Sequence, residues 1–294
     1  MISVNDLIDD RYRIIALLGE GGMGAVYEAL DIITRRRVAI KFLKPEVAKD
    51  QDNLERFERE ARAMASLSHP NIVSVLNVGY FNGIHYMINE LIIGKTLDSE
   101  LDTRGRFTYL EAIDILDQLC VAIKLAHSKN VIHRDIKPSN IYISSDGVVK
   151  LGDFGIAELT TAKRVTMNSN ILGSAHYLAP EICQGKKASA QSDLYSLGIT
   201  LFQLVTGRIP FDGETIVDVA IKQIKEPLPS PRKYIHTFPL ALEKVIKKAT
   251  KKRPAERYVT IDEFHKALLH LKHNPSLLKP HQSIWVRWFG FASE

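Results

Sequence analysis

Short hydrophobic runs alternate with polar residues along the first third of the chain, and glycines separate several of these runs. This pattern is typical of β-strands joined by tight turns. The expected strands are residues 14–18, 25–29, 38–42, 72–76 and 84–88, with a turn region at residues 79–83. The first three should form a glycine-turned hairpin followed by a third strand.

One segment of this region instead has apolar residues spaced three or four positions apart. They are Leu54, Phe57, Ala61, Met64 and Leu67. This spacing places all of them on one side of a helix, with charged residues on the other sides. We therefore expect five strands and one helix before the character of the chain changes.

Helical spacing dominates the rest of the chain. Thr108 and Glu111 form a capping-box pattern at the start of one helix. A second helix, at residues 191–206, should begin around Ser192, be buried on most faces and end at Gly207. Later helices are expected at residues 215–224, 239–250 and 260–271.

These patterns divide the chain into a small lobe at residues 1–93, a larger helical lobe at 94–272 and a tail at 273–294. The tail carries an aromatic cluster at residues 284–291 that is too short to span a bilayer. We favour packing of the tail against the larger lobe. An interfacial membrane anchor or a partner-binding peptide is the alternative.

Composition narrows the class of protein. With 294 residues, 45% of them hydrophobic and 25% charged, the chain should be globular with a sizeable core. A net charge of +5 mildly favours acidic or phosphate-bearing partners, but the basic runs lack interleaved aromatic residues, so no nucleic acid is expected. Two distant cysteines, Cys120 and Cys183, suggest neither a disulfide framework nor a cysteine-based metal site.

The N-terminus has acidic residues where a signal peptide would have basic ones followed by an apolar run. No uninterrupted apolar segment approaches the roughly 20 residues that span a bilayer. We therefore expect a soluble, cytoplasmic chain.

The densest candidate chemistry lies in residues 133–140, His-Arg-Asp-Ile-Lys-Pro-Ser-Asn. Asp135 can accept or orient a hydroxyl proton, and Lys137 can neutralise a transferring phosphoryl group. Asn140 offers an oxygen to a cation such as Mg²⁺. Taken alone, the segment also fits an ordinary polar turn.

A glycine-rich segment precedes it in the small lobe. Gly19, Gly21, Gly24 and Val26 match the pattern G-x-G-x-x-G-x-V between two expected strands. A dinucleotide-binding fingerprint would lead directly into a helix, which this segment does not. Backbone without side chains can approach phosphates closely and offer N–H groups to them.

Lys41 ends the third expected strand. It could hold phosphate oxygens if a carboxylate fixed its ammonium group, although a solvent-exposed lysine is the alternative. Glu60 on the following helix is the first candidate for that carboxylate, and Glu58 is the second. Asp153, in the sequence Asp-Phe-Gly, would supply a second cation ligand beside Asn140.

These segments, together with Ala-Pro-Glu at residues 179–181, occur in an order that resembles the protein-kinase family from about Arg11 to Leu271. The resemblance implies an α+β, bilobal protein-kinase fold. The small lobe should be a mainly antiparallel β-sheet with one key helix, and the larger lobe mainly helical.

The resemblance also implies the chemistry. Lys41 would hold the α- and β-phosphates of ATP and pair with Glu60, while Asn140 and Asp153 hold Mg²⁺, for which Mn²⁺ could substitute. Asp135 would receive or orient the substrate hydroxyl. The residues that would surround adenine are Leu18, Val26, Ala39 and Tyr142, with the backbone from Glu90 to Ile92 as its hydrogen-bonding edge. Plain core packing is the alternative for the apolar ones.

One position departs from the family. Asn89, just before this edge, stands where the family usually has an apolar residue, so the back of the nucleotide pocket should be unusually polar. Lys137 and Ser174 resemble serine/threonine kinases more than tyrosine kinases. Ser174 should contact Asp135 and Lys137.

A regulatory segment is implied at residues 156–179. A phosphate on one of its hydroxyl residues could pair with Arg134 and order the segment. The candidates are Thr160, Thr161, Thr166 and Ser169. The family further implies that Asp193 holds the backbone at residues 133–134 and that Arg257 pairs with Glu181.

Within the family, the glycine segment and residues 57–73 are similar to bacterial eukaryotic-like (Hanks-type) serine/threonine kinases. Many of these continue through a membrane helix, so we expect either a cytosolic member or the cytoplasmic part of a membrane kinase. The leading hypothesis is an ATP-dependent kinase that phosphorylates protein Ser/Thr hydroxyls and itself, with a homodimer for the self-reaction. A pseudokinase scaffold and a small-molecule phosphotransferase are the alternatives.

Overall fold

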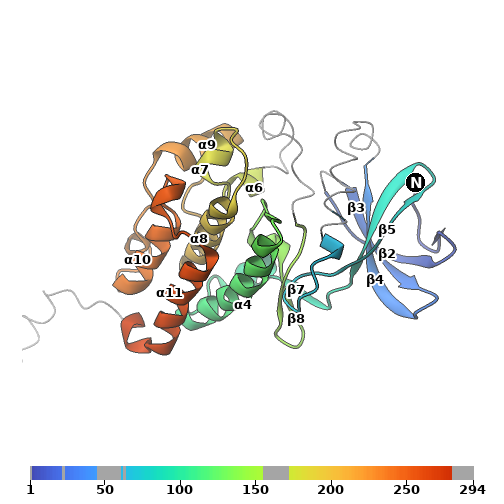
Figure 1. Cartoon of the computed structure of the whole chain (residues 1–294), viewed down its shortest axis with the longest axis horizontal. Coiled ribbons are helices and arrows are strands. Elements are labelled where there is room, and N and C mark those ends of the chain that lie inside the picture. The colour runs from blue at the N-terminus through green and yellow to red at the C-terminus, as the bar shows by residue number, and fades with distance from the viewer. Residues whose placement is uncertain (1, 22–23, 45–60, 62–63, 155–171, 280–294) are drawn as a thin grey trace, which may run out of the picture.

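The computed structural model describes residues 2–21, 24–44, 61, 64–154 and 172–279. Strands gather in one lobe and helices in the other, with a narrow junction between them (Figure 1). This confirms the expected α+β, two-lobed kinase fold.

The small lobe is built on an antiparallel sheet with the strand order β1-β2-β3-β4-β6-β5. Its strands are β1 (Leu7–Ile8), β2 (Tyr12–Glu20), β3 (Gly24–Asp31), β4 (Arg36–Leu43), β5 (Val75–Phe81) and β6 (Ile84–Glu90). The sequence analysis missed β1, which is only two residues long and therefore too short to show an alternating pattern.

The strand expected at residues 72–76 was placed too early, because β5 begins at Val75. Ile72 makes instead an isolated parallel bridge with Leu151. The turn before β6 is also tighter than expected. It consists of Asn82 and Gly83, whose φ angles are 48° and 82°, whereas Gly79 lies within β5. An added Cβ at Gly79 would come within 2.2 Å of the Tyr86 ring, so packing rather than turn geometry requires this glycine.

Alternation along β4 gives the sheet two different faces. Val38, Ile40 and Phe42 are buried in a cluster with β2 and β6. Ala39 and Lys41 point to the opposite face, from which Lys41 contacts Asp153. Most of the helix expected at residues 54–67 lies outside the described residues.

The larger lobe contains α3 (Leu97–Arg104), α4 (Tyr109–Ser128), α6 (Leu172–Ala175), α7 (Pro180–Cys183), α8 (Ala190–Thr206), α9 (Ile216–Lys225), α10 (Leu240–Ala249) and α11 (Ile261–His273). A second antiparallel sheet, β7 (Gly94–Thr96), β8 (Ile141–Ser144) and β9 (Val149–Leu151), lies at the junction (Figure 1). Neither α3 nor this small sheet was expected. The later helices agree with the sequence analysis to within two residues.

Two helices, α4 and α8, show how the sequence sets the boundaries. The Thr108 Oγ1 accepts the Glu111 amide at 3.3 Å, and Glu111 Oε2 accepts the Thr108 amide at 2.8 Å, which confirms the capping box. The start expected around Ser192 was too late: α8 begins at Ala190, and the Ser192 hydroxyl accepts the Ser189 amide at 3.2 Å. Gly207 ends α8 with a φ of 69°, as expected.

The core of the larger lobe forms around α8, which is buried along nearly its whole length. Helix α11 packs on α4 (Figure 1), and Leu278 in the first part of the tail joins the same core. The aromatic cluster of the tail lies outside the described residues. Within the part of the chain that the structure describes, no helix is long and apolar enough to cross a membrane.

Candidate active site

Asp193, near the start of α8, holds the turn that begins the 133–140 segment. Its Oδ2 accepts the His133 amide at 2.8 Å, and its Oδ1 accepts the Arg134 amide at 2.8 Å. His127 Nε2 lies 2.8 Å from the same Oδ2. Arg134 has a φ of 72°, a left-handed conformation that is unfavourable for a residue with a side chain. The buried carboxylate therefore stabilises a turn that the backbone would not adopt readily, as the family resemblance implied.

His133 joins this turn to the segment that carries Asp153. Its Nδ1 accepts the Asp135 amide at 3.2 Å, so the proton of the neutral ring lies on Nε2, which donates to the Gly152 carbonyl at 3.0 Å. The ring also packs on Phe154, with centroids 4.4 Å apart. Burial lowers the pKa of His133 from its ordinary value of 6.5, which agrees with a neutral imidazole.

Asp135, Lys137 and Asn140 lie together, as the sequence analysis expected. Asn140 Nδ2 donates to the Asp135 carbonyl at 2.8 Å and to its Oδ2 at 3.0 Å. Lys137 Nζ lies 2.9 Å from the same Oδ2 and donates to Ser174 Oγ at 2.6 Å. The Asp135 side chain is only 13% exposed, so these contacts fix its position. Ser174 contacts Lys137 as expected.

Lys41 reaches across from the small lobe to Asp153 of the larger one. Its Nζ lies 2.5 Å from Asp153 Oδ1. The Lys41 ammonium lowers the pKa of the Asp153 carboxyl, although burial acts in the opposite direction. Glu60, the predicted partner of Lys41, lies outside the described residues, so the carboxylate that the structure places against Lys41 is Asp153.

The glycine segment combines one sterically required glycine with two that face open space. An added Cβ at Gly24 would come within 1.8 Å of the Phe42 carbonyl oxygen, because β3 and β4 pair closely there. An added Cβ at Gly19 or Gly21 would meet no atom within 4 Å. The Gly21 amide closes the turn by donating to the Gly24 carbonyl at 2.8 Å. Gly19 and Gly21 thus leave room for a ligand beside the strand ends.

The residues expected around adenine come from both lobes. Val26 pairs directly with Lys41 on the neighbouring strand, and Ala39 lies two positions before Lys41 on the same face of β4. Leu18 is half exposed at an irregular register of β2. From the larger lobe, the Tyr142 ring of β8 packs against Gly152, where an added Cβ would come within 2.9 Å of it. Ile92 follows β6 and is partly buried.

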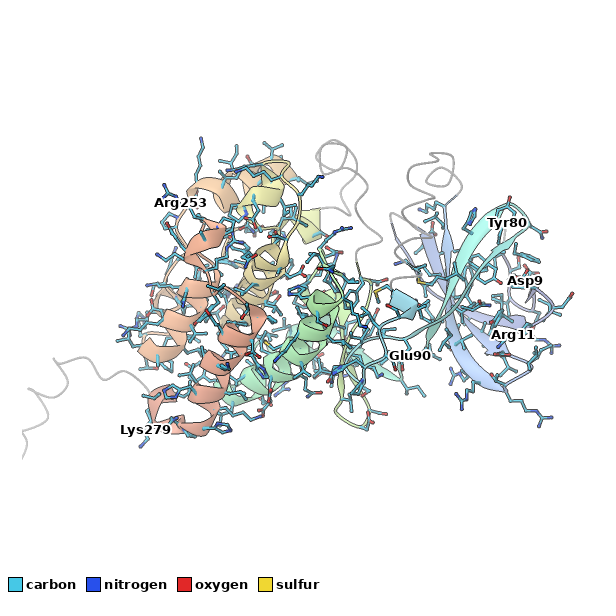
Figure 2. All side chains as sticks on the ribbon, in the orientation of Figure 1. Asp9, Arg11, Tyr80, Glu90, Arg253 and Lys279 are labelled. Carbon is cyan, nitrogen blue, oxygen red and sulfur yellow. The ribbon has the colours of Figure 1, made fainter. Side chains whose placement is uncertain are left out.

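Glu90 has a side-chain role that the sequence analysis missed. Figure 2 shows it at the junction of the lobes. Its carboxylate accepts the Ser74 amide at 2.8 Å and pairs with Lys150 Nζ at 2.9 and 3.0 Å. The three residues are far apart in the sequence, and no periodic pattern links them. Glu90 therefore connects β6 to β9 through its side chain.

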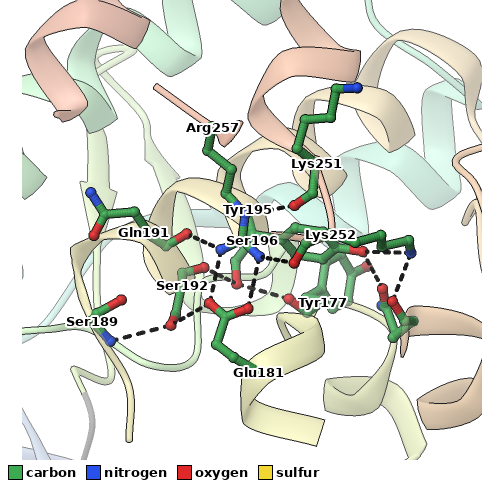
Figure 3. A network of polar contacts seen from close by, with 11 residues as sticks. Tyr177, Glu181, Ser189, Gln191, Ser192, Tyr195, Ser196, Lys251, Lys252 and Arg257 are labelled. Atoms are coloured by element: carbon green, nitrogen blue, oxygen red, sulfur yellow. Dashed lines mark hydrogen bonds and ion pairs between the residues drawn. The ribbon is translucent and has the colours of Figure 1, made fainter. Parts of the chain in front are cut away.

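A second polar network surrounds the buried Glu181 in α7. Arg257 and Glu181 form two hydrogen bonds of 2.8 and 2.7 Å, and Ser192 Oγ donates to Glu181 at 2.9 Å (Figure 3). Burial is the largest single influence and raises the pKa of Glu181, but Arg257, together with the backbone and Ser192 hydrogen bonds, lowers this pKa overall. The pairing implied by the family is confirmed.

Residues 174–177 are also held from α9. Gln223, fully buried, donates through Nε2 to the His176 carbonyl at 2.6 Å and accepts from the Tyr195 hydroxyl. His176 Nε2 lies 3.0 Å from Asp212 Oδ1. Sequence reasoning did not find Gln223, because one polar residue on an amphipathic helix gives no sign that it points inward.

Asn140 and Asp153 fit a hard divalent cation. The Nδ2 of Asn140 is used by Asp135, which leaves its Oδ1 available as a ligand. Asp153 offers a carboxylate that is 37% exposed. Among the described residues no three His, Cys, Asp or Glu side chains gather into a metal site. Two protein oxygens completed by phosphate and water oxygens are typical of Mg²⁺ bound with a nucleotide.

Several known proteins are similar to this chain in sequence, and others are similar to it in fold. Serine/threonine-protein kinase PrkC of Bacillus subtilis is 44% identical over 256 residues, which is 87% of this chain and 40% of that protein. Serine/threonine-protein kinase PknA of Mycobacterium tuberculosis is 40% identical over 281 residues, 94% of this chain and 64% of that protein. The chain thus spans less than two thirds of the length of these relatives.

Among solved structures, the PknI kinase domain of Mycobacterium tuberculosis superposes with a TM-score of 0.76 at 26% identity, covering 92% of this chain and 99% of that one. The family model described as "Protein kinase domain" matches residues 12–270. That range holds the glycine segment, the cluster around Asp135 and the Glu181–Arg257 network. The chain therefore belongs to the protein kinase domain family.

Proposed function

We propose that the chain is an ATP- and Mg²⁺-dependent kinase that phosphorylates serine and threonine hydroxyls of proteins. The observation that carries the proposal is the cluster in which Asp135 Oδ2 lies within 3.0 Å of both Lys137 Nζ and Asn140 Nδ2. The names of the bacterial relatives support the same activity.

The two lobes would have different roles. Residues 1–93 would bind the nucleotide, with Gly19 and Gly21 giving the phosphates access to backbone N–H groups, and residues 94–272 would supply the reaction centre. Lys41 would bind the α- and β-phosphates, and its ionic contact with Asp153 already brings the two parts together. Bound Mg²⁺–ATP supplies the γ-phosphoryl group and partial neutralisation of its charge.

Asp135 orients the acceptor hydroxyl and receives its proton. Its carboxylate is held by Asn140, so the oxygen that faces the substrate keeps a fixed direction. Lys137 lies between Asp135 and Ser174 and can neutralise charge on the transferring group. Since Ser174 belongs to the segment that precedes Ala179, a protein substrate bound there would lie directly beside the reaction centre.

The experiment is phosphoryl transfer from γ-labelled ATP to a generic basic protein. Asp135→Ala should lower the rate at least 100-fold, because the loss of a positioned general base typically costs this much. Asp153→Ala should also abolish most transfer. The matched control is Asp114→Ala. The carboxylate of Asp114, on α4, pairs with Lys272 on α11, and its removal should keep the wild-type rate.

Each alternative predicts a different outcome. A pseudokinase scaffold would show no transfer by the wild-type chain, and a small-molecule phosphotransferase would label no protein. We also propose that the chain phosphorylates one of Thr160, Thr161, Thr166 or Ser169, within a homodimer. Mass spectrometry after incubation with ATP tests this, and a fully active chain with none of the four modified would contradict it.

A further inference from the structure

The positive charge of the chain is concentrated in one segment. Residues 222–253 contain ten lysines and arginines but only two acidic residues, Glu226 and Glu243, which gives this segment a net charge of +8. The whole chain has 39 basic and 34 acidic residues, so the remainder is net negative. Net charge of this kind influences association rather than the fold. The segment is therefore a candidate interaction surface.

Helix α10 presents several of these charges on one side. Leu242 and Ile246 on its inner side are fully buried in the core of the larger lobe. The outer side carries exposed residues spaced three or four positions apart, which places them in one row along the helix. This row, the α10 basic face, consists of Leu240, Lys244, Lys247, Lys248 and, just beyond the last turn, Lys251.

Neighbouring carboxylates do not cancel the charge of the α10 basic face. Glu243 is buried beneath it and is shared between Lys247 Nζ at 2.7 Å and Arg232 Nε at 3.0 Å. Among the described residues, no carboxylate lies within ion-pair distance of Lys244 or Lys251. The face therefore keeps an excess of positive charge in contact with solvent.

The chemistry and shape of this face favour a lipid surface over a protein or nucleic acid partner. All of its cations are lysines, whose flexible ammonium groups act as point charges, whereas arginine offers a planar fork that recognises a single carboxylate or phosphate. The side of a helix is convex, and Leu240 at its start is apolar and 41% exposed. Clustered lysines beside an exposed apolar residue are typical of helices that lie on anionic membranes.

We propose that the α10 basic face binds the surface of a membrane that contains anionic phospholipids. The lysine ammonium groups contact the lipid headgroups, and Leu240 enters the headgroup region. Helix α10 lies at the end of the larger lobe away from the small lobe (Figure 1), so a membrane bound there leaves the cluster around Asp135 uncovered. This surface is separate from the candidate active site, and the inference does not depend on the proposed kinase activity.

The test is co-sedimentation of the whole chain with lipid vesicles. Vesicles of phosphatidylcholine alone are compared with vesicles that also contain phosphatidylserine. The chain should bind only the vesicles with phosphatidylserine. Raising the salt concentration from about 0.05 M to about 0.5 M should weaken this binding at least about tenfold, because salt screens exposed charges.

A triple variant locates the contact on the chain. Lys244→Gln, Lys248→Gln and Lys251→Gln together should weaken vesicle binding about 100-fold, at about fivefold for each lysine. The matched control removes three exposed charges elsewhere. It combines Arg13→Gln on β2, Arg36→Gln on β4 and Lys129→Gln after α4.

The control should bind the vesicles within about threefold of wild type, because charges farther from the membrane than the Debye length are screened. Thermal unfolding shows whether both triple variants fold, and their Tm should stay within about 2 °C of wild type. If the lysine variant does not fold, the lipid and salt comparisons with the unchanged chain still decide.

Four results would overturn the inference. Equal weakening by the two triple variants would mean that net charge, rather than this face, governs binding. Unchanged binding of the lysine variant would place the lipid contact elsewhere in the chain. Equal binding to both kinds of vesicle would exclude recognition of anionic lipid. Binding to polyglutamate or DNA, but not to vesicles with phosphatidylserine, would assign the face to an acidic protein or a nucleic acid.

Discussion

Individual side chains at the centre of the larger lobe are fixed by charged hydrogen bonds rather than by packing alone. Arg257 is fully buried and donates to Glu181 and to the carbonyls of Gln191, Lys251 and Lys252. Figure 3 shows these groups converging on one guanidinium. Every donor of such a group must be paired, because a buried charge is otherwise very unfavourable.

Arg257→Ala should lower the free energy of unfolding by about 3–5 kcal/mol, because Glu181 would stay buried without its cation. Urea unfolding measures this. Lys251→Ala, which removes an exposed side chain from the same segment, should change stability by no more than about 0.5 kcal/mol. A cost below about 1 kcal/mol for Arg257→Ala would show that water or another cation replaces the guanidinium.

Single elements show which parts of the fold local sequence can specify. The capping box at Thr108 and the glycine stop at Gly207 act within a few residues, and both were predicted correctly. Strand β1 pairs with β2 through two register positions only, and the Ile72 bridge depends on Leu151 nearly eighty residues away. Such pairings are set by tertiary contacts, which residue spacing does not reveal.

The glycine segment allows a matched comparison between two positions in neighbouring strands. Gly24→Ala should destabilise the protein by about 1–3 kcal/mol, because its methyl group would overlap the Phe42 carbonyl. Gly19→Ala meets no atom within 4 Å and should leave stability within about 1 kcal/mol of wild type, while ATP affinity falls. Urea unfolding and nucleotide binding separate the two effects. Equal stability losses would contradict the assignment.

At the scale of the whole molecule, the candidate site is assembled from segments that lie far apart in the sequence. The motif order was sufficient to predict the cluster of Asp135, Lys137 and Asn140. The Lys41–Asp153 contact and the support from Gln223 required coordinates, because the residues lie on different elements whose relative placement no spacing rule gives. His133 links these segments, since it bonds both the Asp135 amide and the Gly152 carbonyl.

Acidification should weaken this link. Burial lowers the pKa of His133 in the folded chain below the value of 6.5 that it has in the unfolded chain. At a pH between these two pKa values, the unfolded chain therefore binds more protons than the folded chain. Stability contributed by the neutral ring is therefore complete above pH 6.5 and is lost as pH falls below it. Thermal unfolding between pH 7.5 and 5.5 (roughly the histidine range) should show a decreasing Tm.

His133→Asn should make this decrease shallower, although it lowers Tm at every pH. Part of the decrease should remain, because burial also lowers the pKa of His69. An unchanged pH dependence in His133→Asn would show that His133 does not contribute to it.

The contacts of the Glu90 carboxylate should resist rotation of one lobe against the other. This carboxylate binds Ser74 at the approach to β5 and Lys150 in β9, next to the point where the chain passes between the lobes. Rotation of one lobe against the other must either move these groups together or separate the ion pair between Glu90 and Lys150. Their side chains are 27% and 18% exposed. Because dissolved ions screen partly exposed charges, the stiffness of the junction should decrease as ionic strength rises.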